Sequence, residues 1–99
     1  MLVLSRGENE TLVIGGQRVT IQKVSQEAIK VRIDGADDNS SPQDLKLALN
    51  EPHALNEGVR IIYIDSREVG STRRARIAVD APAEVPVHRL EVWEAMRRA

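Results

Sequence analysis

The chain has no cysteine and no phenylalanine, and Tyr63 and Trp93 are its only tyrosine and tryptophan. The lack of cysteine excludes disulfides, thiolate metal sites and cysteine nucleophiles, and it fits a reducing cytoplasm. With so few aromatic side chains, the core must be aliphatic. Ninety-nine residues fit one domain, at the small end of what buries a core of its own. Such a chain often gains stability by sharing its core with a second copy.

Long apolar runs are missing as well. No stretch approaches the roughly 20 residues that a membrane-spanning helix needs. The first residues lack the charged and apolar regions of a signal peptide. We therefore expect a soluble protein of the cytoplasm.

Positive charge is not in excess, since the formal net charge is −1. The charges are unevenly spread, because residues 34–57 hold Asp34, Asp37, Asp38, Asp44, Glu51 and Glu57 against Lys46. The rest of the chain is mildly basic, which is compatible with RNA binding. An ordinary mixed-charge surface explains the charges equally simply, and from charge alone it is the better interpretation.

The sequence also lacks the residue patterns of an enzyme. His53 and His88 are far apart, with no cysteine and no metal-ligand spacing near them. Glu8 and Glu10 alternate on an extended segment, where a solvated surface explains them better than acid–base catalysis. No glycine-rich phosphate loop precedes a helix. We expect neither an enzyme, nor a metal site, nor a cofactor.

Alternating apolar residues predict a mainly β fold with antiparallel sheets and short α-helices. In the first third of the chain this alternation, with a tight turn at Gly15-Gly16, predicts an antiparallel meander. Strand signals resume at 59–65, are interrupted by a turn region at 66–72, and return through Val79 and Val87. We expect one domain over residues 1–99.

Two helices are predicted. Ser41 and Pro42 have the pattern of an N-cap and first helical residue, so we expect a helix over 42–50 that uses Leu45, Ala48 and Leu49 to dock. Leu90, Trp93 and Met96 are spaced for one face of a closing helix, and Arg97 and Arg98 suit its C-terminal end.

The chain contains one internal sequence similarity, between Val31-Arg32-Ile33 and Ala75-Arg76-Ile77. A duplicated or inserted hairpin would produce it. Any two amphipathic strands of this length also look alike, and on similarity alone chance is the better explanation.

Two segments at opposite ends of the chain resemble one family. The opening MLVLSRGENETLVIG and the later RIAVDAPAEVPVHRLE cover about a third of the chain. Their clearest pieces are Glu10-Thr11-Leu12, Ile14-Gly15, Ala81-Pro82, Glu84-Val85 and Val87-His88-Arg89. In this order they resemble the CsrA/RsmA carbon storage regulators, which are small RNA-binding proteins.

The resemblance implies an intertwined, strand-exchanged homodimer in which the first strand of one subunit lies beside the last strand of the other. Arg6 would then meet Arg89 of the partner subunit. Each of two sites would bind a GGA sequence in an mRNA leader hairpin and so control translation or mRNA stability. Sequestering small RNAs and a protein antagonist are further implied partners.

The RNA-binding residues implied by the resemblance lie on the first strand and in the tail segment. The planar guanidinium of an arginine and the backbone groups of an edge strand can form hydrogen bonds with the exposed edges of single-stranded purines. A histidine after a strand, such as His88, is as often a capping or packing group as a ligand contact. Arg89 at the strand-to-helix junction could simply be solvated, but its pairing with Arg6 in the resemblance favours a function. The residues are Leu4, Ser5, Arg6, Ala81, Pro82, Val85, Val87, His88 and Arg89.

The chain departs from the family pattern in ways that support a rival function. Its extra length is interpreted as an insertion at about 36–73, adding the 42–50 helix and one strand pair, docked away from Arg6 and Arg89. Gly7 stands where the family often has a second arginine, and Leu90 replaces an acid. The rival is a protein-interaction module on the same scaffold with reduced or lost RNA binding.

Overall fold

The computed structural model describes residues 1–35, 41–56 and 58–98, which form nine strands and one helix. The predicted mainly β class with antiparallel sheets and a C-terminal helix is confirmed. The elements are β1 Leu2–Gly7, β2 Thr11–Ile14, β3 Gln17–Val24, β4 Ala28–Asp34, β5 Gln43–Ala48, β6 His53–Asn56, β7 Val59–Val69, β8 Thr72–Asp80, β9 Val87–Arg89 and α1 Leu90–Arg98.

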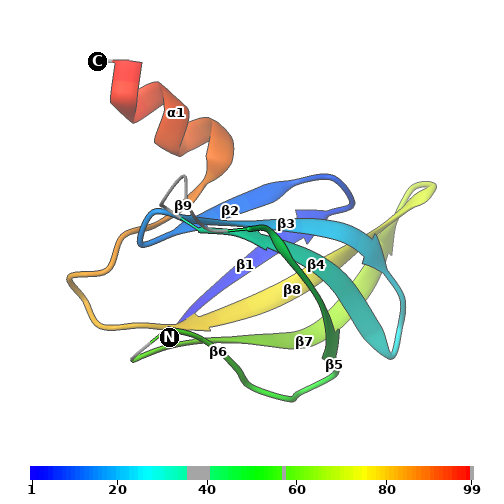
Figure 1. Ribbon diagram of the computed structural model, residues 1–99. Coiled ribbons are helices and arrows are strands. Elements are labelled where there is room, and N and C mark those ends of the chain that lie inside the picture. The colour runs from blue at the N-terminus through cyan, green and yellow to red at the C-terminus, as the bar shows by residue number, and fades with distance from the viewer. Residues whose placement is uncertain (36–40, 57, 99) are drawn as a thin grey trace.

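The strands form two antiparallel sheets that pack face to face, with α1 on the outer side of the larger one (Figure 1). One sheet has the order β1-β8-β7-β6, and the other has the order β5-β4-β3-β2-β9. The predicted meander holds for β2, β3 and β4. It fails for β1, which crosses to the other sheet and pairs with β8 instead of β2.

The core between the sheets is aliphatic, as the composition predicts. Alternate residues of each strand point inward, so Leu12 and Ile14 on β2 face Ile61 and Ile77 on the other sheet within one apolar cluster. Tyr63 is the one aromatic residue of that cluster. It is fully buried, and its hydroxyl donates a hydrogen bond of 2.6 Å to the Ser25 carbonyl oxygen.

The helix predicted over 42–50 is wrong, because residues 43–48 form strand β5. Leu45 and Leu47 point toward the core while Asp44 and Lys46 face solvent, which is the period of a strand. Pairing with β4 sets Asp44 opposite Arg32, and the two side chains form an ion pair of 2.9 Å. Backbone pairing along the edge of β4 therefore outweighs the local helix-start signal.

The turn predicted at 66–72 is present, but it is shorter than predicted. Strand β7 continues to Val69 and β8 begins at Thr72, so the turn consists of Gly70 and Ser71. The described part of the expected insertion, 36–73, consequently contains β5, β6, β7 and the start of β8 rather than a helix and one strand pair.

Candidate nucleic-acid interface

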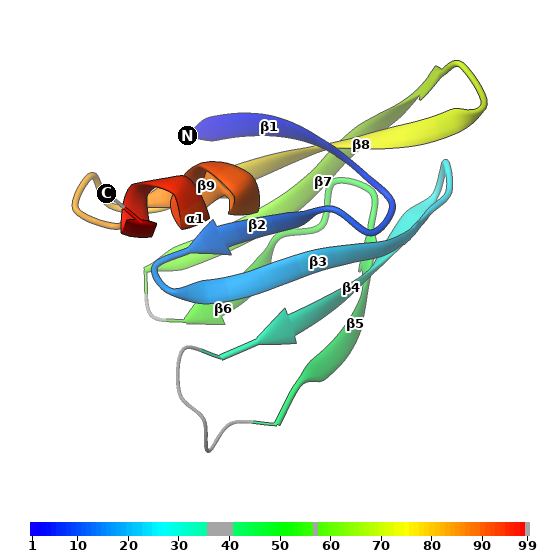
Figure 2. The ribbon, with the colours of Figure 1, turned by 90° about the horizontal axis from the view of Figure 1, so that it is seen from above.

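The two segments singled out in the sequence meet within one chain. Arg6, near the end of β1, reaches Glu91 in the first turn of α1, directly after β9. Its Nη2 lies 3.0 Å from Glu91 Oε1, and its Nη1 lies 3.4 Å from Oε2. Figure 2 shows β1 and β2 flanking α1. One molecule thus holds both ends of the expected site.

Strand β1 forms an edge of the four-stranded sheet. It pairs with β8 alone, with Leu4 opposite Ile77 and Ser5 opposite Arg76. Leu4 packs against the core, whereas Ser5 lies on the outer face. The Ser5 carbonyl accepts a hydrogen bond of 3.2 Å from Arg74 Nη2.

Strand β9 forms an edge of the five-stranded sheet. Its His88 lies opposite Val13, and its Arg89 lies opposite Leu12. A turn closed by the Val85 amide on the Pro82 carbonyl, at 3.0 Å, brings the chain to this edge. The Gly15 amide then donates to the Pro86 carbonyl at 2.9 Å. These bonds fix the position of β9 beside β2.

Arg6 is buried, with 4% of its surface exposed, and it belongs to a network of ion pairs. Glu10 Oε2 lies 3.8 Å from Arg6 Nη2, and Glu10 Oε1 lies 3.1 Å from Arg74 Nη2. The Gly7 amide also donates to Glu10 Oε1 at 2.5 Å. Arg6 Nε is buried without a hydrogen-bond partner in the structure. The guanidinium therefore ties β1, the β1–β2 turn and α1 together.

The carboxylates around Arg6 are held in their charged form. The pKa of Glu10 is lowered, chiefly by the hydrogen bond from the Gly7 amide and further by Arg6 and Arg74. The pKa of Glu91 is lowered by a hydrogen bond from its own backbone amide and by Arg6. Since both glutamates are ionised at neutral pH, the positive charge of Arg6 is already compensated.

A cleft of about 280 Å³ lies beside this network. Arg6 lines it together with three acidic side chains, Glu10, Glu91 and Glu94. Such a lining repels phosphate, so a nucleic-acid backbone is better accommodated outside this cleft. Arg89 is exposed and is the arginine of the predicted pair that is accessible to a ligand.

The nine predicted residues divide into two groups. Three on β1 and three on β9 lie at the two sheet edges that Arg6 and Glu91 connect, and the other three lie in the β8–β9 connection. Leu4, Ala81, Val85 and Val87 are partly buried against the core, so each has a packing role. Pro82 and Arg89 are exposed, and His88 is half-buried.

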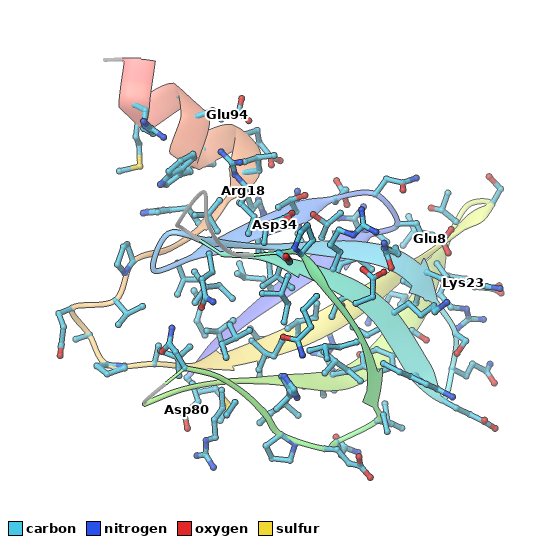
Figure 3. The ribbon with its side chains drawn as sticks, viewed as in Figure 1. Glu8, Arg18, Lys23, Asp34, Asp80 and Glu94 are labelled. Carbon is cyan, nitrogen blue, oxygen red and sulfur yellow. The ribbon has the colours of Figure 1, made fainter. Side chains whose placement is uncertain are left out.

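A cluster of arginine and tryptophan beside β9 was missed in the sequence. Arg18 and Arg97 place their guanidinium carbons 5.5 and 4.6 Å from the centre of the Trp93 ring. In Figure 3, Arg18 lies on the five-stranded sheet below α1, where Glu94 is labelled. The spacing of Trp93 and Arg97, one helical turn apart, could have indicated half of this cluster. Arg18 could not be placed, since its approach depends on how α1 packs on the sheet.

In the part of the chain that the structure describes, no helix is long and apolar enough to span a membrane. Within 1–35, 41–56 and 58–98, no three histidine or acidic side chains gather to hold a metal ion.

Comparison with known proteins finds a relative among bacterial regulators. The chain is 39% identical over 49 residues to a protein of Rhodopirellula baltica named translational regulator CsrA. The aligned stretch covers 50% of this chain and 64% of the relative. No family model matches the chain. No solved structure matches it either.

Proposed function

We propose that the chain is an RNA-binding regulator of translation related to the CsrA/RsmA family. The observation that carries the proposal is the meeting of β1 with β9 and α1 through Arg6 and Glu91. The partial match to a protein named as a translational regulator points the same way. The ligand proposed is a GGA sequence in the hairpin loop of an mRNA leader, and binding there controls translation or mRNA stability.

The accessible groups of this region suit single-stranded RNA. Arg89 can present a planar fork of donors to a guanine edge. Arg18 and Arg97, which are exposed beside the half-buried Trp93 ring, add two cations for RNA phosphates. Arg6, held by Glu91 and Glu10, acts as a positioning residue that sets the angle between β1 and α1.

The test is a mobility-shift titration with a GGA hairpin and a second hairpin in which GGA is replaced by CCA. Arg89→Ala should weaken binding of the GGA hairpin by about 1–3 kcal/mol, or about 5- to 150-fold, because a forked base contact is lost. The fold should stay intact, since the Arg89 side chain is exposed. The parent should prefer the GGA hairpin over the CCA hairpin.

Arg67→Ala is the matched control. Arg67 is also an exposed arginine, but it lies on β7 near the β7–β8 turn, at the opposite end of the molecule from α1 (Figure 1). It should bind as the parent does. Equal weakening by both substitutions would indicate a general charge effect, and no weakening by Arg89→Ala would show that Arg89 does not read the RNA.

The second candidate function is a protein-interaction module with reduced or lost RNA binding. The acidic cleft beside Arg6 favours it, because three glutamates there offer little to a phosphate and much to a basic peptide. Failure of the parent to bind either hairpin at moderate salt would select this function.

The other partners implied by the resemblance are also an RNA and a protein, and both concern the surface around Arg89. Sequestering small RNAs would compete for the Arg89 surface, and a protein antagonist would cover it. The resemblance also implies a strand-exchanged homodimer. Within this one chain, β1 already pairs with β8 and β5 already pairs with β4, so an exchange of strands between two sheets needs no second copy.

A further inference from the structure

The two sheets are related by an exchange of strands. Replacing β1 by β5, β2 by β6, β3 by β7 and β4 by β8, and the reverse, converts the order β1-β8-β7-β6 into β5-β4-β3-β2. The second order is that of the first four strands of the larger sheet. Residues 2–34, the first repeat, and 43–80, the second repeat, therefore follow the same path, and each gives its first strand to the sheet of the other (Figure 2).

The irregularities of pairing occur at equivalent places. The β3–β4 pairing shifts register between Ile21 and Lys23, and the β7–β8 pairing shifts between Tyr63 and Asp65. Just before the shift, Ile21 lies opposite Val31, and Tyr63 lies opposite Ile77. A bulge at one position of a ladder is a specific feature. Its recurrence supports common descent of the two repeats.

The turns agree in the same way. In the part of the chain that the structure describes, Asn9 and Asn50 are the non-glycine residues with positive φ, at 68° and 62°. The Asn9 amide donates to the Ile21 carbonyl at 2.6 Å, and the Asn50 amide donates to the Tyr63 carbonyl at 2.7 Å. Each repeat thus closes its first turn on the equivalent residue of its third strand.

Sequence identity follows the structural equivalence. The asparagines are each followed by glutamate, and Arg18 opposite Asp34 corresponds to Arg60 opposite Asp80. In the structure, Val31 of the first repeat is equivalent to Ile77 of the second, whereas the similarity noted in the sequence aligned Val31 with Ala75. The similarity noted in the sequence was therefore two residues out of register with the structural equivalence.

The repeats differ at the candidate interface. After β8 the chain continues into β9 and α1, whereas after β4 it leads to β5. Strand β9 pairs with β2, but among the described residues no strand lies on the outer side of β6, the equivalent of β2. Register also makes Leu47 the counterpart of Arg6, since Arg6 lies opposite Ala75 and Leu47 lies opposite Ile29. Leu47 is buried in the core.

We propose that this chain is a tandem duplication that acts as a monomer with a single nucleic-acid interface. The interface formed by β1, β9 and α1 is complete within one chain. The equivalent place beside β5 and β6 has Leu47 where Arg6 would be, and among the described residues it has no strand that corresponds to β9. The ligand of this interface rests on the function proposed above, whereas the monomeric duplication rests on topology, register and turns alone.

Sedimentation equilibrium, with and without the GGA hairpin, tests the proposal. The free protein should have the mass of one chain, 11.0 kDa. The saturated complex should contain one chain and one hairpin. Lys46→Ala, at the counterpart of Ser5 on the exposed edge of β5, should leave the affinity within twofold, whereas Arg89→Ala should lower it.

Each outcome decides between the two proposals. A stable dimer of the free protein, or two hairpins bound per chain, would overturn the monomer with a single interface. A loss of affinity in Lys46→Ala as large as that in Arg89→Ala would overturn it as well. A monomer that binds no hairpin would support the duplication while rejecting the RNA-binding function.

Discussion

Asn9 and Asn50 sit in a backbone conformation that most residues avoid. Their φ angles of 68° and 62° lie in the left-handed region, where a Cβ crowds the following carbonyl. Asparagine tolerates this region better than other non-glycine residues do. Both residues also donate their amides across the fold, to Ile21 and Tyr63. The two turns therefore require the same backbone conformation, and both have asparagine at the position that adopts it.

Replacing either asparagine with alanine should lower the free energy of unfolding by about 1–2 kcal/mol, because alanine has no compensation for the left-handed conformation. Glycine at the same positions should be tolerated. Urea unfolding of the four single variants measures both effects. If Asn9→Ala were costly and Asn50→Ala neutral, the two turns would not be structural equivalents.

The burial of Arg6 shows what residue patterns cannot predict. The sequence placed Arg6 on a strand correctly, and alternation puts it on the same face as Leu4. The pattern did not indicate that a charged side chain would be buried there, at the position where the second repeat has Leu47. A buried guanidinium is tolerated only with anionic partners nearby. One of them, Glu91, is supplied by the far end of the chain, so it could not be identified before the fold was known.

At the scale of elements, strand β5 shows how tertiary pairing overrides a local signal. A serine cap, a first-turn proline and an early acid favoured a helix over 42–50. The alternation of Leu45 and Leu47 with Asp44 and Lys46 was equally present in the sequence. The strand forms because β4 provides a partner edge and the core has room for Leu47. The prediction of a closing helix is confirmed by α1.

The attachment of α1 to β1 should depend on pH. The pKa values of Glu10 and Glu91 are lowered in the folded protein, by backbone amide hydrogen bonds first and by neighbouring arginines second. A carboxylate with a depressed pKa contributes stability that is fully present above its usual value of 4.5. That contribution is lost as the pH falls from 4.5 through the lower folded value.

Thermal or urea unfolding between neutral pH and about pH 3 should therefore show a loss of stability in acid that is smaller in Glu91→Gln. Glu84→Gln, which changes an exposed carboxylate in the turn before β9, is the control and should follow the parent. An unchanged acid dependence in Glu91→Gln would mean that the ion pair with Arg6 contributes nothing to folding.

At the scale of the molecule, the halves are interleaved rather than adjacent. Strand β1 belongs to the sheet of β6, β7 and β8, and β5 belongs to the sheet of β2, β3 and β4. The single apolar cluster draws on both sheets. Neither repeat can bury its apolar face without the other, although the sequence alone had suggested one domain with an insertion.

Unfolding should consequently be one cooperative transition. Tyr63 reports on the four-stranded sheet, and Trp93 reports on α1 packed over the five-stranded sheet. Urea unfolding followed by tyrosine and by tryptophan fluorescence should give coincident curves, as should far-UV circular dichroism. Separate midpoints for the two fluorophores would show that the sheets unfold independently.

The contrast between Arg6 and Leu47 has a consequence for how such a protein can change. In an assembly of identical chains, every substitution occurs at each symmetry-related position at once. Here the equivalent positions are encoded separately, so one half can be selected for recognition while the other is selected for packing. A strand of RNA has a direction, and an interface that occurs once per molecule can be adapted to that direction without keeping a second, rotated copy of the same surface.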